Sequence, residues 1–208
     1  MNGNEYEPLQ REYSKIAAEY DNRWRFYIEA SIRGTLQRLH VTPDSRALDV
    51  GCGTGALLES LSRAVPQAQF AGVDLSEEML RVARSRLPST VNLTRARAEM
   101  LPFGEATFDF VFSTNAFHFI RNPLASLREM GRVLKPAGTL VITDWCDDYL
   151  ACRVCDLFLR LFSRAHVRTY GSGECRQILV DAGLSKVRVE RYAINWLWGL
   201  MTATAQRR

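Results

Sequence analysis

The chain has 208 residues, of which 47% are hydrophobic and 24% are charged, and its formal net charge at pH 7 is +4. These values are typical of a single globular domain, here residues 1–208, and they exclude a second complete domain and a long disordered region. The small charge excess, with arginines that form no dense stripe, argues against a nucleic-acid groove.

The N-terminal segment is polar and charged, so it predicts neither a secretion signal nor a membrane anchor. The most apolar late run, residues 192–201, is too short to cross a bilayer as a helix. The five cysteines lack the spacing of a secreted disulfide framework. We therefore expect a cytoplasmic protein without a membrane span. Monomer and dimer are both compatible with the sequence.

Hydrophobic periodicity predicts the elements in chain order. Residues 12–39 predict one or two amphipathic helices, which would form an N-terminal cap over residues 1–40. Strand-like and helix-like segments then alternate: strands at 45–51, 68–76, 91–100, 108–115 and 138–145, and helices at 55–65, 76–87 and 123–134. Ser76 is the expected N-cap of the helix at 76–87. The nearly apolar segment 108–115 predicts a central strand.

After residue 144 the alternation stops. Residues 147–165 place large apolar side chains on one helical face, and they follow the fifth strand at the end where ligands bind. We therefore expect residues 145–170 to form a lid and one wall of an acceptor pocket. A helix at 172–184 and an antiparallel hairpin of strands at 185–192 and 197–206 complete the chain. The predicted fold is α/β, a doubly wound, seven-stranded and mostly parallel sheet.

A glycine-rich loop, residues 49–56 (DVGCGTGA), follows the first strand. Gly51, Gly53 and Ala56 have the spacing of a dinucleotide fingerprint, with Asp74 about twenty residues further on. The loop alone does not separate a nicotinamide cofactor from another adenosine ligand. An NAD-binding oxidoreductase would also need a substrate domain after the sheet, and too few residues remain there.

Four stretches together resemble the class I S-adenosylmethionine-dependent methyltransferases, most closely the small UbiE-like (methyltransferase domain 11) branch. These stretches are residues 47–55 (ALDVGCGTG), 72–80 (GVDLSEEML), 95–103 (RARAEMLPF) and 108–144. The resemblance implies a Rossmann-like methyltransferase fold and an enzyme that moves a methyl group to an acceptor by direct displacement. S-adenosyl-L-methionine would be the cofactor and S-adenosyl-L-homocysteine the product. Two positions depart from the family pattern: Ala137 replaces a glycine, and Glu99 replaces the more frequent aspartate.

The resemblance also implies which residues hold the cofactor. Gly51 and Gly53 would let the backbone approach the ligand, and Asp49 would help to fix the methionine ammonium group. Asp74 would accept hydrogen bonds from both ribose hydroxyls. The remaining implied contacts are Tyr13, Tyr20, Cys52, Leu75, Met79, Ala98, Glu99, Met100 and Asn115. For each of these residues a purely structural role stays open as the alternative to cofactor binding, such as capping of the loop by Asp49 or core packing of Leu75.

The acceptor is less clear from the sequence. His118 and Tyr170 are candidate catalytic residues, with a buried histidine between helix and sheet as the alternative for the former. The segment STNAFHF lacks the [D/N/S]-P-P-[Y/F] element of amino-methylating DNA enzymes, and no Pro-Cys nucleophile is present. We therefore expect a small-molecule acceptor and no nucleic-acid partner. A catalytically silent adenosylmethionine-binding protein is the alternative.

Cys152 and Cys155 form a C-x-x-C pair, with Cys146 nearby. The pair lies within an apolar-periodic helix that has no second pair or histidine at ligand spacing, so we expect free thiols and no metal site. A thiophilic acceptor such as arsenite is a minor alternative.

Overall fold

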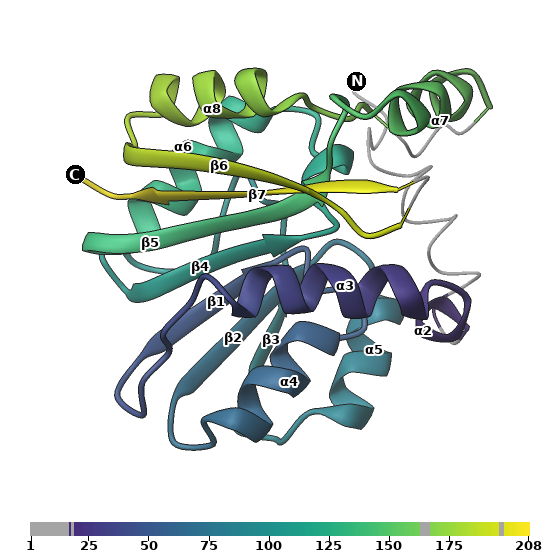
Figure 1. Cartoon of the computed structure of the whole chain (residues 1–208). Helices are drawn as coiled ribbons and strands as arrows, with labels where there is room; N and C mark the ends of the chain where they lie inside the picture. The colour runs from purple at the N-terminus through teal and green to yellow at the C-terminus, as the bar shows by residue number, and fades with distance from the viewer. Residues whose placement is uncertain (1–16, 18, 163–166, 196–197) are drawn as a thin grey trace, which may run out of the picture.

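The computed structural model describes residues 17, 19–162, 167–195 and 198–208. Its centre is a seven-stranded sheet in the order β3-β2-β1-β4-β5-β7-β6 (Figure 1). The strands from β3 to β5 are parallel neighbours, whereas β7 is antiparallel to both β5 and β6. The predicted doubly wound fold with a C-terminal hairpin is therefore confirmed, and β4 lies in the middle of the sheet as expected.

The strands are β1 (Arg46–Val50), β2 (Gln69–Asp74), β3 (Asn92–Arg95), β4 (Phe108–Thr114), β5 (Leu134–Trp145), β6 (Ser185–Ala193) and β7 (Gly199–Gln206). The helices are α2 (Tyr20–Arg23), α3 (Arg25–Leu36), α4 (Ala56–Ala64), α5 (Glu77–Arg86), α6 (Pro123–Val133), α7 (Leu150–Phe162) and α8 (Ser172–Asp181), with a short 3-10 helix η1 (Phe117–Phe119). Among the described residues, no helix is both long and apolar enough to cross a membrane.

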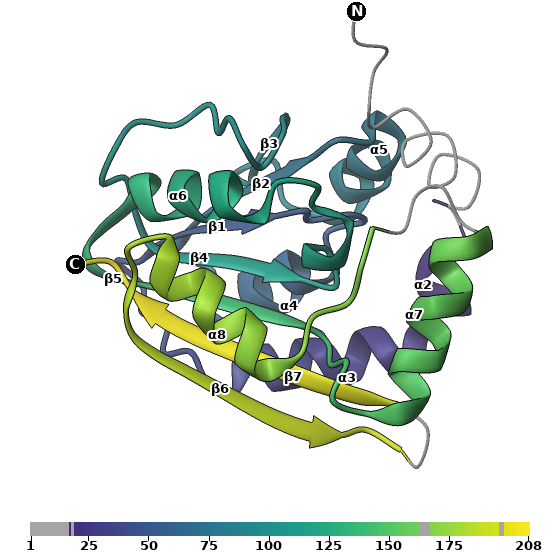
Figure 2. The same cartoon turned by 90° about the horizontal axis from the view of Figure 1, so that it is seen from above.

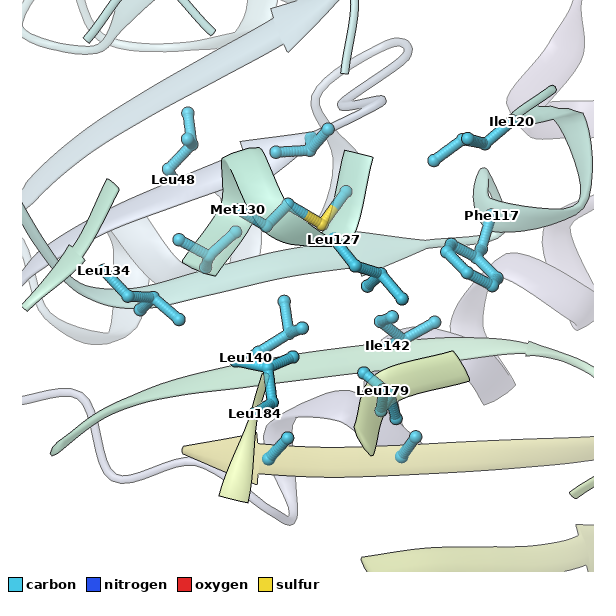
Figure 3. Close-up of a cluster of buried hydrophobic side chains, with 14 of the residues drawn as sticks. Leu48, Phe117, Ile120, Leu127, Met130, Leu134, Leu140, Ile142, Leu179 and Leu184 are labelled. Atoms are coloured by element: carbon cyan, nitrogen blue, oxygen red, sulfur yellow. The ribbon is translucent and has the colours of Figure 1, made fainter. Parts of the chain in front are cut away.

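Helices cover both faces of the sheet (Figure 2). The face under α6 and α8 contains Leu48, Leu140 and Ile142 packed against Leu127 and Leu179, and Figure 3 shows these side chains pointing toward one another. On the opposite face, α4 and α5 bury leucines against Phe70, Phe112 and Val141. Because successive strand residues point to opposite faces, the apolar runs of β1 and β4 supply both cores.

Two predicted strand lengths were wrong. The third strand, expected at 91–100, ends at Arg95, because the chain then turns and Arg97 forms an isolated bridge with Met100. The fifth strand begins earlier than expected, because Leu134 already pairs with Phe108 before an irregularity in the register. Ala137 lies within this irregular part, where its φ of 61° is in the left-handed region that favours glycine.

Candidate functional site

A pocket opens at the carboxyl ends of β1, β2 and β4. Because these strands are parallel, the loops that follow them meet at one edge of the sheet. The pocket is lined by most of the residues predicted to contact the cofactor: Tyr20, Asp49, Gly51, Cys52, Gly53, Asp74, Leu75, Met79, Ala98, Glu99 and Asn115. Tyr13 lies outside the described residues, and Met100, a residue that is 73% exposed, is not among the described lining residues.

The glycine loop needs its glycines for two different reasons. Gly51 has a φ of +77°, and a Cβ built there would come within 2.4 Å of the Ala116 Cβ. Gly53 has a φ of +53°, and a Cβ there would enter open space. Gly51 therefore allows the loop to contact Ala116, whereas Gly53 leaves the pocket side of the loop without a side chain.

The Asp74 carboxylate holds the loop in place from the end of β2. Its Oδ2 accepts a hydrogen bond from the Gly53 amide at 2.8 Å, and its Oδ1 accepts one from the Ser76 amide at 2.9 Å. Burial raises the pKa of Asp74, and these amide hydrogen bonds oppose the increase. Each oxygen still has a second lone pair, so the carboxylate can accept ligand hydroxyls while it supports the loop.

Asp49 and Asn115 bring unsatisfied acceptors to the same pocket. Within the described part of the chain, neither Asp49 Oδ1 nor Asn115 Oδ1 has a hydrogen-bond partner, although both atoms are buried. Burial, with the nearby Asp74 charge as the second cause, raises the pKa of Asp49 to about 8. Buried acceptors without partners are rare and costly in folded proteins. The pair therefore indicates a ligand group that donates hydrogen bonds and carries positive charge.

Sequence reasoning missed the contact between α2 and the glycine loop. Asp21 lines the pocket, and its carboxylate accepts a hydrogen bond from the Thr54 hydroxyl at 2.7 Å. The Arg86 guanidinium lies 2.6 Å from the same carboxylate, and it also donates to the Thr54 carbonyl. These contacts hold α2 over the loop. Each residue looks like an ordinary surface residue in the sequence, so local patterns give no signal for the contact.

The rest of the lining is largely apolar and comes from elements on either side of the sheet edge. Met79 is 2% exposed, and it reaches the pocket from α5, whose N-cap Ser76 accepts from the Met79 amide as predicted. Further lining residues that the sequence did not single out are Ile28, Ile32, Thr54, Phe119 and Ile120.

His118 is buried behind the pocket and is oriented by Asp144. The His118 Nδ1 lies 2.7 Å from Asp144 Oδ1, and its backbone amide donates to Asp144 Oδ2 at 2.9 Å. Since a carboxylate only accepts, Nδ1 is the donor in this hydrogen bond. The His118 ring also stacks on Trp145, with 5.5 Å between ring centroids. Asp144, which the sequence did not indicate, is thus the residue that fixes this imidazole.

The other acceptor-side predictions are less closely connected to the pocket. Neither His118 nor Tyr170 is among its described lining residues. The Tyr170 ring is buried against Phe117, with 5.1 Å between ring centroids, and burial raises the pKa of Tyr170 to about 12. The described lining also contains no residue of the segment 145–170. The acceptor roles of these residues and of the lid stay predictions.

All five cysteines are free thiols. Burial raises the pKa of Cys146 to about 11 and that of Cys175 to about 12, so these thiols are poor nucleophiles. No group of three or more metal-binding side chains occurs among the residues that the structure describes.

Comparison with known proteins places this geometry in context. A family model described as "Methyltransferase domain" matches residues 48–142. Demethylmenaquinone methyltransferase from Staphylococcus aureus is 29% identical over 213 aligned positions, which cover 89% of this chain and 88% of that protein.

Many solved structures share the fold, and two of them illustrate it. One is a complex of the Haloferax volcanii Trm112 methyltransferase activator with a methyltransferase, with a TM-score of 0.82, 21% identity, and coverage of 94% of this chain and 97% of that one. The other is a phosphoethanolamine N-methyltransferase from Haemonchus contortus in complex with S-adenosylhomocysteine. It has a TM-score of 0.81 at 16% identity, over 99% of this chain and 60% of that one.

Proposed function

Because the chain is a class I S-adenosylmethionine-dependent methyltransferase, we propose that its pocket binds S-adenosylmethionine and that it methylates a small-molecule acceptor. The observation that carries this proposal is the pair of buried, unpartnered acceptors on Asp49 and Asn115. A methionine ammonium group complements both atoms in charge and in hydrogen bonding.

The other lining residues fit the rest of this cofactor. Asp74 has lone pairs for the ribose hydroxyls beside its two amide contacts. Leu75, Met79 and Ala98 offer apolar contacts for adenine, and Glu99 offers an acceptor for its amino group. When bound, S-adenosylmethionine supplies a methyl group on a positively charged sulfur. The chain contributes by binding and orienting both reactants and by excluding water.

The acceptor side supports a partly apolar small molecule. Phe119 and Ile120 line the pocket next to Asn115, and His118 is oriented behind them by Asp144. For an acceptor that must lose a proton, His118 is the candidate general base. A relative is named for demethylmenaquinone, which agrees with an acceptor of this class. The absence of a base-binding Pro-Pro element after β4 favours a metabolite over nucleic acid.

The experiment that tests turnover is a screen for acceptor-dependent formation of S-adenosylhomocysteine over a metabolite library that includes quinones. We expect product with at least one small acceptor and none with oligonucleotides. Cofactor binding without product from any acceptor class would instead favour a silent binding protein. The cytoplasmic location stays a prediction.

A further inference from the structure

Buried hydroxyl groups join α3 to the sheet beside the pocket. The Thr35 Oγ1 of α3 lies 2.7 Å from the Thr143 Oγ1 of β5 and 3.2 Å from the Thr114 Oγ1 of β4. The Thr143 Oγ1 lies 3.0 Å from the Thr202 Oγ1 of β7, which in turn lies 3.0 Å from the Tyr192 hydroxyl oxygen of β6. We call these five side chains the hydroxyl network. It connects one helix with four strands.

The hydroxyl network restricts where α3 can lie on the sheet. Thr35, Thr143 and Thr202 are almost completely buried, and each has a hydrogen-bond partner within the network. A shift of the helix would leave buried hydroxyl groups without partners, which is costly. Ile32 and Leu36 of α3 also pack against the core on this face, but apolar contacts are not directional. The hydroxyl groups therefore specify the position of α3.

Gly34 allows the network to reach β6. It lies within α3, where glycine stabilises a helix less than alanine does. A Cβ built on Gly34 would come within 1.9 Å of the Tyr192 hydroxyl oxygen. An alanine would therefore displace this hydroxyl group from Thr202. The hydroxyl network thus accounts for a glycine that helix propensity alone does not favour.

Two parts of the pocket depend on the position of α3 and of the network. Ile28 and Ile32 line the pocket from α3, about two turns and about one turn before Thr35. Thr114 lines it from β4 and directly precedes Asn115, whose buried Oδ1 has no partner among the described residues. Thr35 is not itself among the described lining residues. It can therefore act on a ligand only through the residues that it holds in place.

We propose that Thr35 is a positioning residue for the ligand pocket, and that its hydroxyl group holds the α3 wall and Thr114 in their places around the ligand. The inference rests on the proposed function, because the probe that tests it is S-adenosylhomocysteine. Small displacements of a pocket wall weaken binding, because protein and ligand groups must meet with precise geometry. A purely structural role would change the free energy of unfolding and leave ligand affinity unchanged.

The test compares Thr35→Val with Thr35→Ser by calorimetry with S-adenosylhomocysteine. Valine keeps the branched shape of threonine but lacks the hydroxyl group, whereas serine keeps the hydroxyl group. We expect Thr35→Val to lose at least about fivefold in affinity, and Thr35→Ser to stay within about twofold of the wild type.

The matched control is Ser126→Ala on α6. Ser126 is fully buried, as Thr35 is, and neither residue is among the described lining residues. The hydroxyl oxygen of each lies 3.0 Å from the carbonyl oxygen four residues earlier in its helix. Both substitutions thus remove this contact within the helix, but only Thr35→Val also breaks the hydroxyl network. Ser126→Ala should bind S-adenosylhomocysteine within about twofold of the wild type.

Hydrogen exchange of the backbone amides gives a readout that needs no ligand. Thr35→Val should accelerate exchange in α3, whereas Ser126→Ala should accelerate it in α6 and not in α3. If Thr35→Val does not fold, Thr143→Val becomes the test variant, because it breaks the same 2.7 Å contact from the side of β5.

Three results would overturn the proposal: wild-type affinity in the valine variant, an equal loss of affinity in Thr35→Ser, or an equal loss in Ser126→Ala. The second would show that the hydroxyl group is not responsible, and the third that lowered stability alone weakens binding. If the wild type itself does not bind S-adenosylhomocysteine, the proposed function fails. Unchanged exchange in α3 of the valine variant would then overturn the positioning role separately.

Discussion

Two neighbouring regions at this edge of the sheet differ in where their buried polar atoms find hydrogen-bond partners. One region is the pocket, and the other is formed by η1 and the end of β5. On the pocket side, buried oxygens of Asp49 and Asn115 have none among the described residues. On the other side, Asp144 accepts three hydrogen bonds, from the ring and amide of His118 and from the Trp145 amide. The first region leaves two buried acceptors available to a ligand, whereas in the second region the Asp144 carboxylate is satisfied by neighbouring donors and positions a side chain.

The largest effect should come from Asp74→Ala. This substitution removes two ligand hydrogen bonds to a charged group, each with a net contribution of ~1.5–3 kcal/mol. Calorimetry should show a loss of affinity for S-adenosylmethionine of at least about tenfold. The matched control is Asp109→Ala, because Asp109 contacts the Arg46 amide and Lys135 at the start of β4, away from the pocket. Wild-type affinity in Asp74→Ala would contradict the assignment of the ribose site.

Asp49 should make cofactor binding depend on pH. Its pKa is about 8 in the free protein because of burial and the nearby Asp74 charge, so the carboxyl group is mostly protonated at pH 6. An ammonium group binds the ionised form, and binding must therefore release a proton. We expect affinity to rise by up to about tenfold between pH 6 and pH 7. Calorimetry in buffers of different ionisation enthalpy measures the released proton.

The same shift has a consequence for stability. Because the folded-state pKa of Asp49 is raised above the value of 3.8 for an exposed carboxyl, its contribution to stability is present at low pH and is lost as pH rises toward 8. Asp49→Asn removes the titrating group, and its affinity should be lower and nearly constant with pH. A wild-type affinity that does not change between pH 6 and pH 7 would argue against the ammonium contact.

Asp144→Asn should separate the two regions. Since Asp144 contacts His118 and not the pocket, affinity for S-adenosylmethionine should stay within about threefold of the wild type. The asparagine amide can no longer enforce the proton on Nδ1, so nitrogen-15 chemical shifts of the His118 ring should show a changed tautomer population. A large loss of cofactor affinity with an unchanged tautomer would show that Asp144 supports the pocket instead.

The smallest effect is expected from Ala137→Gly, and it concerns the free energy of unfolding. Its left-handed backbone conformation costs an L-residue about 1–2 kcal/mol, and glycine adopts it without this cost. Ala137→Gly should therefore raise the free energy of unfolding by up to ~1 kcal/mol, after the larger entropy loss of glycine is included. Denaturant unfolding measures the change, and cofactor affinity should not move. A destabilised variant would mean that the alanine methyl group makes a contact that matters.

Local patterns selected residues that the fold brings together in one pocket, because these residues lie in short contiguous motifs. The spacing of Gly51, Gly53 and Asp74, and the Ser76 cap, are each readable within a few residues of a strand end. Two contacts join segments that are far apart in the sequence, namely Asp21 with Arg86 and His118 with Asp144. Because each contact joins distant segments, no short motif predicts it.

The direction of side chains was the second feature that local sequence patterns did not predict. Periodicity predicted the apolar face of α7, but it does not say whether such a face turns inward or outward. The structure turns this face outward, with Leu150 and Leu161 largely exposed. The same limit applies to Met100, which was expected at the cofactor and points to solvent. Side-chain direction in a loop depends on the turn, and residues 97–100 form a turn where a strand was predicted.

The most direct test of the central claim is calorimetric titration of the wild-type chain with S-adenosylmethionine, S-adenosylhomocysteine and NAD in parallel. The account predicts that both adenosyl amino acids bind at one site per chain, because each carries the ammonium group that Asp49 and Asn115 require. NAD shares the ribose and adenine but lacks that group, so it should bind at least about tenfold more weakly. NAD that binds more tightly than S-adenosylmethionine would contradict the account.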